Sequence, residues 1–344
     1  MTELRCQPAG EGSSTIRIGR GLAADLAGWL GDRRAFVYRD PAIARERLPG
    51  LAGPELVAPA GEAGKTLANC ERLLRAMVAA GLDRTSLLLT IGGGAVGDLG
   101  GLAASLFLRG IELWSCPTTL LAMVDSAVGG KTAVNLPEGK NLAGTVHPAS
   151  LVVVDVDFAA TLPEAEFRSG LAEVVKMAIG RDAGLFALLE RERNGVLARD
   201  PELLQRLVAG ALTAKIAIVE RDLHETGERR LLNLGHTLGH ALEAHADGRI
   251  PHGLCVARGL HFAIELAVAE QLLTPADAAR CTRLLTAYGF DRDPLPPTAA
   301  LAPFLQRDKK IEGGEVHFVF PTGIGASTAL RLPIGRLLAQ LDRG

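Results

Sequence analysis

The chain has 344 residues, of which 48% are hydrophobic and only 4% aromatic, and its formal net charge is −2. This length exceeds one ordinary core and predicts two domains. The near-neutral charge argues against a general affinity for nucleic acid or anionic membranes, and no apolar run reaches the roughly 20 residues needed to span a bilayer. The opening residues lack the basic-then-apolar order of a signal peptide. The five cysteines are scattered without a CxxC pair, so we expect reduced thiols in a cytoplasmic protein.

The first half of the chain alternates short apolar runs with helical patterns. We expect helices over residues 22–30, 66–82 and 99–110, and a short strand leading into the turn at 56–65. Longer strands are expected over 15–19, 34–40, 86–91, 111–119 and 150–158. The run 86–91 is continuously apolar, as in a parallel sheet that is buried on both faces. Strands that alternate with helices predict βαβ units and a doubly wound, Rossmann-like sheet.

The second half has a mainly helical period, with apolar residues three or four apart. We expect helices over 163–179, 183–198, 201–223 and 234–246, and one late strand over 315–321. The change of pattern falls near residue 160. We therefore predict an α/β nucleotide-binding domain over 1–160 and an all-α domain over 161–344, with the metal and substrate sites in the latter.

A glycine-rich turn follows the strand expected at 86–91. Gly92, Gly94 and Gly97 satisfy GxGxxG between a strand and a helix, where glycines let the backbone approach a pyrophosphate. Tight packing explains such a turn equally well, and this is the fourth βα turn rather than the first. Asp40, at the end of an earlier strand, is a candidate for a ribose hydroxyl or for a helix N-cap.

The histidines indicate a metal site. His236 and His240 are four residues apart and share one helix face, as in zinc proteases; the alternative is two satisfied structural histidines. His252 follows within a short loop. Glu173 lies in an apolar helix with Lys176 one turn on, and both need partners there. One carboxylate and two imidazoles with an open position make a zinc-type catalytic site, and the spacing leaves open which two histidines are ligands.

Several basic residues are candidates for binding an anionic substrate. Asp125 and Lys131 flank a glycine pair in an otherwise small and apolar segment, and Lys140 and Asn141 follow. The others lie further along the chain, at Lys215, Arg229, Lys309 and Lys310. Each alone is typical of a solvated surface. Together they would suit a doubly anionic substrate.

These motifs together resemble those of the 3-dehydroquinate synthase family. The resemblance runs from about residue 34 to 328 and rests on GEAGK, GGGAVGD, the segment 107–141, SGLAEVVK, NLGHTLGHALE, PHG and RDKK, in that order. It implies an N-terminal NAD-binding domain, a helical C-terminal domain and a homodimer. It also implies that one divalent metal ion, zinc or cobalt, is bound by Glu173, His236 and His252, whereas His240 faces the substrate phosphate.

The remaining site residues are assigned by the same resemblance. For NAD it implies Asp40, Glu62, Lys65, Gly93, Gly94, Asp98, Thr118, Thr119, Lys140, Phe158, Thr161, Leu162 and Glu166. For the substrate it implies Asp125, Lys131, Asn141, Lys176, Lys215, Glu225, Arg229, Asn233 and one lysine of Lys309 and Lys310. Arg109 would be contributed across the dimer interface.

The reaction implied by the resemblance starts from 3-deoxy-D-arabino-heptulosonate 7-phosphate, in the shikimate pathway to the aromatic amino acids. NAD oxidises a ring hydroxyl transiently, phosphate leaves by β-elimination, and the hydride returns. The ring then opens, and an intramolecular aldol step closes the carbocycle of 3-dehydroquinate. Metal and cations stabilise developing oxyanions and orient both anionic ends of the substrate.

One departure from the family pattern concerns the metal site. The family usually has an acidic residue directly after the glycine of PHG, whereas this chain has Leu254. Because hydrogen-bond partners of ligands tune a metal site, this departure predicts weaker support of His252.

Three rival interpretations remain. Other sugar-phosphate cyclases, of the valiolone or inosose type, use substrates without a carboxylate, and the retained Arg229, Lys215 and Asn233 favour a carboxylate-bearing one. Metal-dependent polyol dehydrogenases typically read PTTAGTGSE where this chain reads PTTLLAMVDSAVGGK. A degenerate, non-enzymatic homologue would have lost ligands that this chain keeps.

Overall fold

The computed structural model describes residues 1–10, 12–306 and 311–342, and it divides into two compact units. The first unit contains Met1–Leu162 together with Leu204–His224, and the second contains Pro163–Leu203 together with Glu225–Gly344. The sequence predicted a single domain boundary near residue 160, which would place Leu204–His224 in the second domain, whereas the structure assigns this segment to the first unit. Their apolar residues have an ordinary helical period, and this period does not indicate which core they join.

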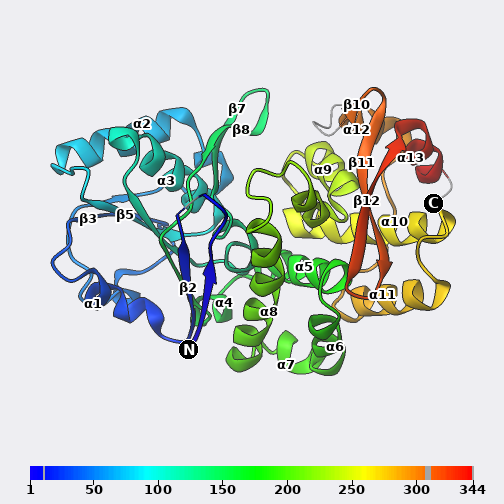
Figure 1. The fold of residues 1–344 in the computed structure, drawn as a ribbon, viewed down its shortest axis with the longest axis horizontal. Helices are drawn as coiled ribbons and strands as arrows, with labels where there is room; N and C mark the ends of the chain where they lie inside the picture. Colours follow the sequence, from blue (N-terminus) through cyan, green and yellow to red (C-terminus); the bar gives the residue numbers. More distant parts are fainter. Residues whose placement is uncertain (11, 307–310, 343–344) are drawn as a thin grey trace. The chain divides into compact units, whose positions relative to one another are not determined.

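The first unit is built on a seven-stranded sheet in the order β1-β2-β9-β6-β5-β3-β4. Figure 1 labels β2, β3 and β5 of this sheet. Only β1 runs antiparallel to its neighbour, and the other pairs are parallel. Every residue of β5 is buried, as the continuous apolar run predicted. The bounds are β1 Thr2–Cys6, β2 Ser14–Gly19, β3 Ala35–Arg39, β4 Glu55–Val57, β5 Leu87–Gly92, β6 Glu112–Pro117 and β9 Leu151–Asp155. The predicted Rossmann-like α/β class is confirmed.

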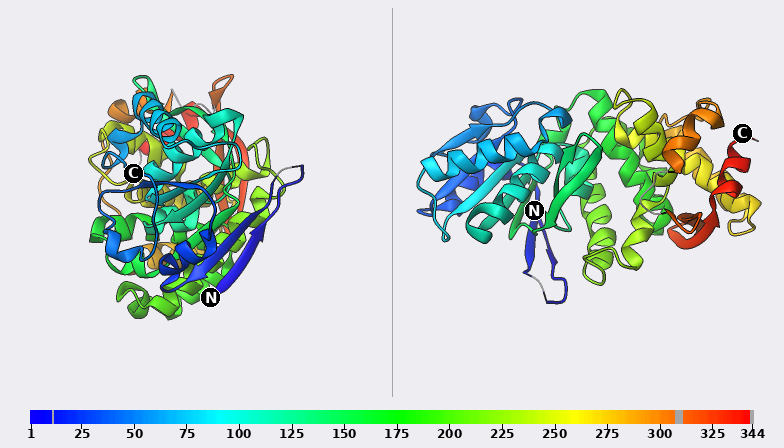
Figure 2. Two further views of the ribbon diagram at one scale, coloured as in Figure 1. Left: turned by 90° about the vertical axis from the view of Figure 1, so that its left-hand side faces the viewer. Right: turned by 90° about the horizontal axis from the view of Figure 1, so that it is seen from above.

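Helices cover this sheet on both faces. In Figure 1, α2 and α3 lie on one side of the sheet and α1 on the other. The strands β1 and β2 form a hairpin, visible in dark blue in Figure 2. The helical bounds are η1 Leu22–Asp25, α1 Leu26–Leu30, η3 Glu62–Gly64, α2 Leu67–Ala79, α3 Gly94–Leu106, η4 Phe107–Arg109, η5 Ala122–Ser126 and α4 Asp157–Ala160, with α8 Pro201–Val219 joining from Leu204 onward.

An antiparallel hairpin of β7 (Lys131–Leu136) and β8 (Gly139–Val146) packs on α3 and was not predicted. Most of β8 is exposed, so it lacks the apolar alternation of a half-buried strand. The approach to α3 is close, because a Cβ on Gly101 would lie 2.4 Å from Cγ2 of Thr132. The hairpin brings Lys131 and Asn141 to the first unit's candidate site.

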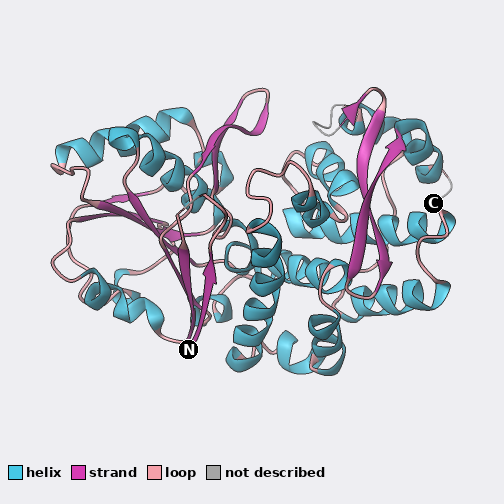
Figure 3. Cartoon of the chain, in the orientation of Figure 1, coloured by secondary structure: helices cyan, strands magenta, loops and turns pink. Residues whose placement is uncertain are grey.

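The second unit is mainly helical, as predicted, but it also contains a three-stranded antiparallel sheet, β10-β11-β12 (Figure 3). Only β11 was expected, so "all-α" is too narrow a description. Strand β12 is largely half-buried or exposed and shows no clear period in sequence. The bounds are α5 Glu164–Gly180, α6 Ala183–Arg191, α7 Arg193–Leu197, η6 Glu228–Asn233, α9 His236–His245, α10 His252–Ala269, α11 Pro275–Ala287, α12 Thr298–Leu305, β10 Ile311–Glu312, β11 Glu315–Gly323, β12 Ala326–Pro333 and α13 Ile334–Leu341.

Helix α10 is long and apolar enough to cross a membrane by length and composition. However, 67% of that stretch is buried inside the unit, where α10 packs against α5 and α9. A buried core helix of a folded domain has these properties, so α10 is not evidence for a membrane span.

Candidate active site

The first candidate site lies where the strand order of the parallel sheet reverses. The chain passes from β3 outward to β4, and then returns to β5 on the other side of β3. In open α/β sheets, ligands bind outside the carboxyl ends of the strands at such a switch point. Asp40 directly follows β3, and its backbone N donates to the carbonyl of Ile91 in β5 at 2.8 Å. Its carboxylate also accepts from Ala42 N at 2.9 Å, so it caps the local turn as well.

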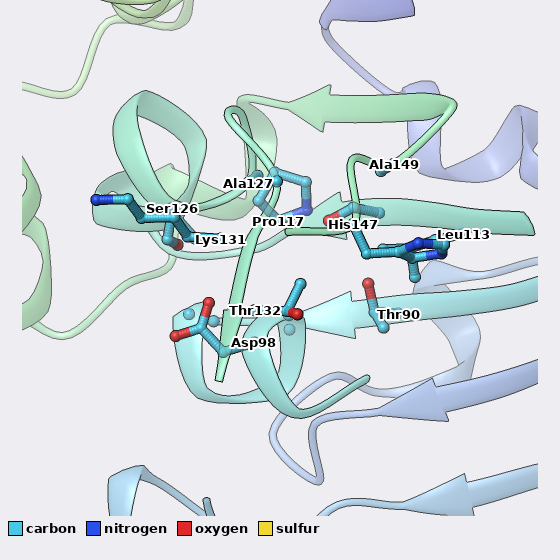
Figure 4. A pocket seen from close by; sticks show the side chains of 17 residues that line it. Thr90, Asp98, Leu113, Pro117, Ser126, Ala127, Lys131, Thr132, His147 and Ala149 are labelled. Carbon is cyan, nitrogen blue, oxygen red and sulfur yellow. The ribbon is translucent and has the colours of Figure 1, made fainter. Parts of the chain in front are cut away.

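The glycine-rich turn serves packing and leaves space for a ligand. A Cβ on Gly92 would lie 2.8 Å from Val96, and one on Gly100 would lie 2.3 Å from Thr90, so these two glycines are needed for close packing. Gly94 and Gly97, together with Gly92, line a cavity at the start of α3, which Figure 4 shows together with Asp98 and Lys131. A Cβ on Gly97 would meet no described atom within 4 Å. Gly97 therefore borders open space in this cavity.

A network centred on the buried Lys65 connects the predicted NAD residues to the β7–β8 hairpin. Lys65, only 3% exposed, places its Nζ 2.5 Å from Asp98 Oδ2 and 2.5 Å from Asn141 Oδ1. Glu62 lies 3.7 Å from the same Nζ, and it accepts from Asn135 at 2.8 Å. Burial raises the pKa of Asp98 above its ordinary value, although the Lys65 ammonium opposes the effect.

Other predicted NAD residues lie at the carboxyl end of the sheet or just beyond it. Thr118 follows β6, and its N donates to Gly92 O at 2.9 Å, next to the glycine turn. Thr161 follows α4, where its Oγ1 accepts from Arg47 at 3.0 Å, and the same guanidinium covers the Phe158 ring at 4.1 Å. Thr119, Lys140 and Leu162 also belong to the first unit, whereas Glu166 is in the first turn of α5 in the second.

Three of the predicted substrate residues lie at η5 and its surroundings in the first unit. Lys215 of α8 is 4% exposed and donates to the carbonyl of Asp125 at 2.6 Å and also to its carboxylate. Lys131 begins β7, is exposed, and lines the cavity of Figure 4. Arg109 has a φ of 70°, in the left-handed region, and follows α3.

The metal-type cluster lies within the second unit and comes from three helices. His236, His240 and His252 each place one ring nitrogen in the cluster, and these three nitrogens lie within 4.8 Å of one another. Glu173 on α5 faces them, with its Oε1 3.6 Å from His252 Nε2 and 3.9 Å from His236 Nε2. The structure thus brings together Glu173 and all three histidines that the sequence singled out.

The Glu173 carboxylate fits the role of a metal ligand. It is 1% exposed, and among the described residues neither oxygen accepts a hydrogen bond of good geometry. Lys176 Nζ lies 2.5 Å from Oε2, so the charge is paired although the angle of that contact is poor. Oε1 is directed toward the histidines. Because a buried carboxylate oxygen without a partner is costly, and because N and O donors converge on it, these residues fit a zinc- or cobalt-type ion.

Glycines allow the three helices to approach closely enough to form the cluster. A Cβ on Gly253 would lie 1.9 Å from Ser169 O, where α10 begins against α5. A Cβ on Gly259 would lie 1.9 Å from Gly235 O, and one on Gly239 would lie 3.1 Å from the Cα of Val256. These contacts fix His252 beside Glu173, and they fix α9 with its two histidines against α10.

Sequence reasoning missed Glu243, which supports His252. The Nδ1 atom of His252 lies 2.9 Å from Glu243 Oε2. Leu254 does not leave His252 without an acidic partner, because α9 supplies one. Glu243 comes three residues after His240 on α9, and that spacing was the available signal. Burial would lower the pKa of His252, but the Glu243 hydrogen bond and the charges of Glu173 and Glu243 raise it overall.

The last group of predicted residues surrounds η6. Asn233 Nδ2 donates to Glu225 Oε1 at 2.7 Å, and Glu225 has a left-handed φ of 58°. Arg229 is 4% exposed. The predicted Lys309 and Lys310, like Asp308 before them, lie outside the described residues.

Comparison with known proteins assigns the class first. The structure matches a 2-deoxy-scyllo-inosose synthase complexed with carbaglucose-6-phosphate, NAD⁺ and Co²⁺, with a TM-score of 0.90 over 100% of both chains at 24% identity. It also matches the 2-epi-5-epi-valiolone synthase of Streptomyces hygroscopicus with NAD⁺ and Zn²⁺ bound, with a TM-score of 0.87 at 29% identity over 99% of this chain and 100% of that one. The fold is that of the sugar-phosphate cyclases.

The sequence comparisons then identify the family. Residues 55–169 match the 3-dehydroquinate synthase N-terminal model, and residues 170–311 match the C-terminal model. The 3-dehydroquinate synthase of Symbiobacterium thermophilum is 42% identical over 341 residues, which are 92% of this chain and 93% of the relative. The chain belongs to the 3-dehydroquinate synthase family, and its activity is that of a phosphate-eliminating lyase.

Proposed function

We propose that the chain converts 3-deoxy-D-arabino-heptulosonate 7-phosphate into 3-dehydroquinate and phosphate, using NAD and one divalent metal ion. The observation that carries this proposal is the buried Glu173 facing His236 and His252, in a chain about 40% identical to 3-dehydroquinate synthases. When bound, NAD supplies a hydride acceptor and donor and the metal ion supplies a Lewis acid. The reaction has no net redox change, so NAD is not consumed.

The proposed NAD site is the switch point of the sheet in the first unit. Asp40 holds a carboxylate beside the glycine turn, where it would accept a hydrogen bond from a ribose hydroxyl. Gly94 and Gly97 leave room at the N-terminus of α3, whose amides favour a pyrophosphate. Lys65 supplies a buried cation near that place. The roles of residues 1–160 in NAD binding and of 161–344 in metal and substrate binding are part of this proposal.

The proposed metal ligands are Glu173, His236 and His252, and His240 is assigned to the substrate phosphate. The Nδ1 atom of His236 lies 3.1 Å from Leu234 O and that of His252 lies 2.9 Å from Glu243, and both rings direct their Nε2 toward Glu173 Oε1. An alternative is a ligand set with three histidines, because His240 also offers a nitrogen to the cluster.

The proposed substrate contacts are mostly cations and amides whose orientation is fixed by neighbours. Lys215 is held by Asp125, and Asn233 is held by Glu225. Preorganised donors of this kind position a flexible dianion for elimination and aldol closure, so much of the rate enhancement is expected to come from orientation. The substrate phosphate itself is the proposed base for the elimination step. The full set is Asp125, Lys131, Asn141, Lys176, Lys215, Glu225, Arg229, Asn233 and His240, with Lys309 or Lys310.

A cytoplasmic homodimer is proposed, with Arg109 contributed to the partner's site. Arg109 lies near several exposed apolar side chains, and a cluster of such side chains on a surface often marks an interface. Ser105 at the end of α3 bonds to Thr145 of β8 at 2.8 Å, so the ends of these two elements are adjacent. The exposed apolar side chains there are Leu106, Leu108, Leu142 and Val146, exposed by 48%, 43%, 40% and 38%.

The decisive experiment measures phosphate release from the heptulosonate phosphate by purified protein with NAD⁺ and Zn²⁺ or Co²⁺. We expect phosphate and 3-dehydroquinate in equal amounts, without accumulation of NADH. Consumption of sedoheptulose 7-phosphate instead would assign the chain to another cyclase activity. Net NADH formation with a polyol would assign it to the dehydrogenases.

A further inference from the structure

The two ring nitrogens of His252 have different surroundings within the second unit. Nδ1 lies 2.9 Å from Oε2 of Glu243, whereas Nε2 lies 3.6 Å from Oε1 of Glu173. The Glu243 side chain is 15% exposed and that of His252 is 25% exposed, so both groups are largely removed from water. A hydrogen bond between such groups holds the ring more firmly than one at the surface.

The geometry points to Glu243 as a positioning residue that fixes the tautomer and the ring plane of His252. An ionised carboxylate only accepts, so the proton of the neutral ring is on Nδ1. The lone pair of Nε2 then faces Glu173 and the other histidines. This inference rests on the proposed function, because it concerns the metal that the cluster is proposed to bind.

His236 provides an internal comparison. Its Nδ1 atom lies 3.1 Å from the carbonyl oxygen of Leu234, so its ring is oriented by the main chain. His252 depends on a side chain from another helix, since Glu243 belongs to α9 and His252 begins α10. The residue after Gly253 is Leu254, which has no acceptor in its side chain. Substitution of Glu243 therefore affects the orientation of one ligand while leaving the other intact.

The experiment compares Glu243→Ala and Glu243→Gln with the unmodified protein in binding of Co²⁺ and Zn²⁺. Affinity is measured by competition with a chromophoric chelator, and ligand geometry by the visible absorption of bound Co²⁺. Loss of such a partner typically weakens metal binding by about 10–100-fold. We expect that loss and an altered Co²⁺ spectrum for Glu243→Ala. Glu243→Gln keeps an acceptor oxygen, so a smaller loss and a nearly unchanged spectrum are expected.

The matched control is Glu190→Gln, which removes an acid that pairs with Arg280 on the surface of the same unit at 2.6 Å. It should bind metal as the unmodified protein does. Thermal unfolding of all variants without metal separates misfolding from loss of a ligand, and a Glu243→Gln protein that melts normally keeps the test valid. Unchanged Co²⁺ affinity and spectrum in Glu243→Ala would overturn the inference, as would a wild-type protein that binds no metal.

These readouts do not depend on turnover. A protein that binds Co²⁺ through a Glu243-dependent site but releases no phosphate from the heptulosonate phosphate would contradict the proposed function and support the positioning role.

Discussion

The ammonium group of Lys65 lies 2.5 Å from Oδ2 of Asp98, and only 3% of the lysine is exposed. Asp98 belongs to α3, and its neighbour Gly97 lines the cavity at the start of that helix. The lysine is therefore held at the proposed pyrophosphate site by an anion whose charge it balances. Bound NAD would interact with the Lys65 ammonium group that already pairs with Asp98, and would not need a cation from solvent.

Replacing Lys65 by methionine is expected to weaken NAD⁺ binding. Charge-assisted hydrogen bonds contribute about 1.5–3 kcal/mol, which corresponds to roughly a tenfold to hundredfold rise in Kd. The measurement is calorimetric titration with NAD⁺. The control is Arg75→Gln, which removes an exposed cation paired with Glu71 at 2.7 Å and should leave the Kd unchanged. Equal affinities in the Lys65 variant and the unmodified protein would contradict the assignment.

The histidines of the cluster are expected to respond differently to substitution. His236→Ala should lose bound metal, whereas His240→Ala should retain metal and turn over at least about a hundredfold more slowly, since it removes a group that orients the phosphate. Metal content of purified protein and phosphate release measure the two effects. His245→Gln, further along α9, is the control. Equal metal loss from His236→Ala and His240→Ala would favour the three-histidine ligand set.

Alanine at Gly253 is expected to destabilise the second unit. The added Cβ would lie 1.9 Å from Ser169 O, a backbone atom, so α10 must move away from α5. Overpacking of this kind costs about 1–3 kcal/mol, and the shift of His252 should also weaken metal binding. The control is Gly28→Ala in α1, where nothing described lies within 4 Å and stability should be unchanged or slightly increased. Denaturant unfolding measures the difference, and equal midpoints for the two variants would refute the packing argument.

Acid stability should depend on Asp83, which caps the turn before β5. Hydrogen bonds from Thr85 and Ser86 lower its pKa from 3.8 to about 2. A carboxylate whose pKa is depressed in the folded state stabilises the protein at pH values above its unfolded-state pKa. That contribution disappears as the pH falls through its folded-state pKa. Asp83→Asn should therefore lower Tm at neutral pH. The difference in Tm between this variant and the unmodified protein should become smaller as the pH falls from 3.8 to about 2. Thr85→Ala, which removes one donor, should act in the same direction but less, and a pH-independent gap would contradict this origin.

The fold was predictable where one hydrophobic period describes an element. Strand β5 is buried on both faces and α5 is buried from Ser169 to Gly180, and both were located from sequence. The β7–β8 hairpin was not, because its outer strand is exposed and its attachment depends on Gly101 of a distant helix. Similarly, the sequence did not indicate that Leu204–His224 joins the first unit, since that depends on packing between segments far apart in the chain.

The candidate site shows the same division. Glu173 was recognisable because an ionisable side chain in an apolar helix is unusual, and the histidines were recognisable from their spacing, whereas the choice of His236 and His252 as ligands came from the family resemblance. The structure brings these residues together. The residues that orient these side chains were not recognisable from sequence. The Glu243–His252 hydrogen bond follows from the packing of two helices, and the Lys65–Asn141 contact follows from the hairpin that the sequence did not reveal.

The glycine contacts that seat α10 against α5 and α9 also determine when the metal site can exist during synthesis. Glu173 leaves the ribosome long before His252, and the α5 and α9 contacts of α10 can form only after α10 has been made. No short peptide from this chain contains the full cluster. A nascent or truncated chain that ends before α10 contains Glu173, His236 and His240 but lacks His252, so the proposed metal site would be complete only once the chain has been made as far as α10.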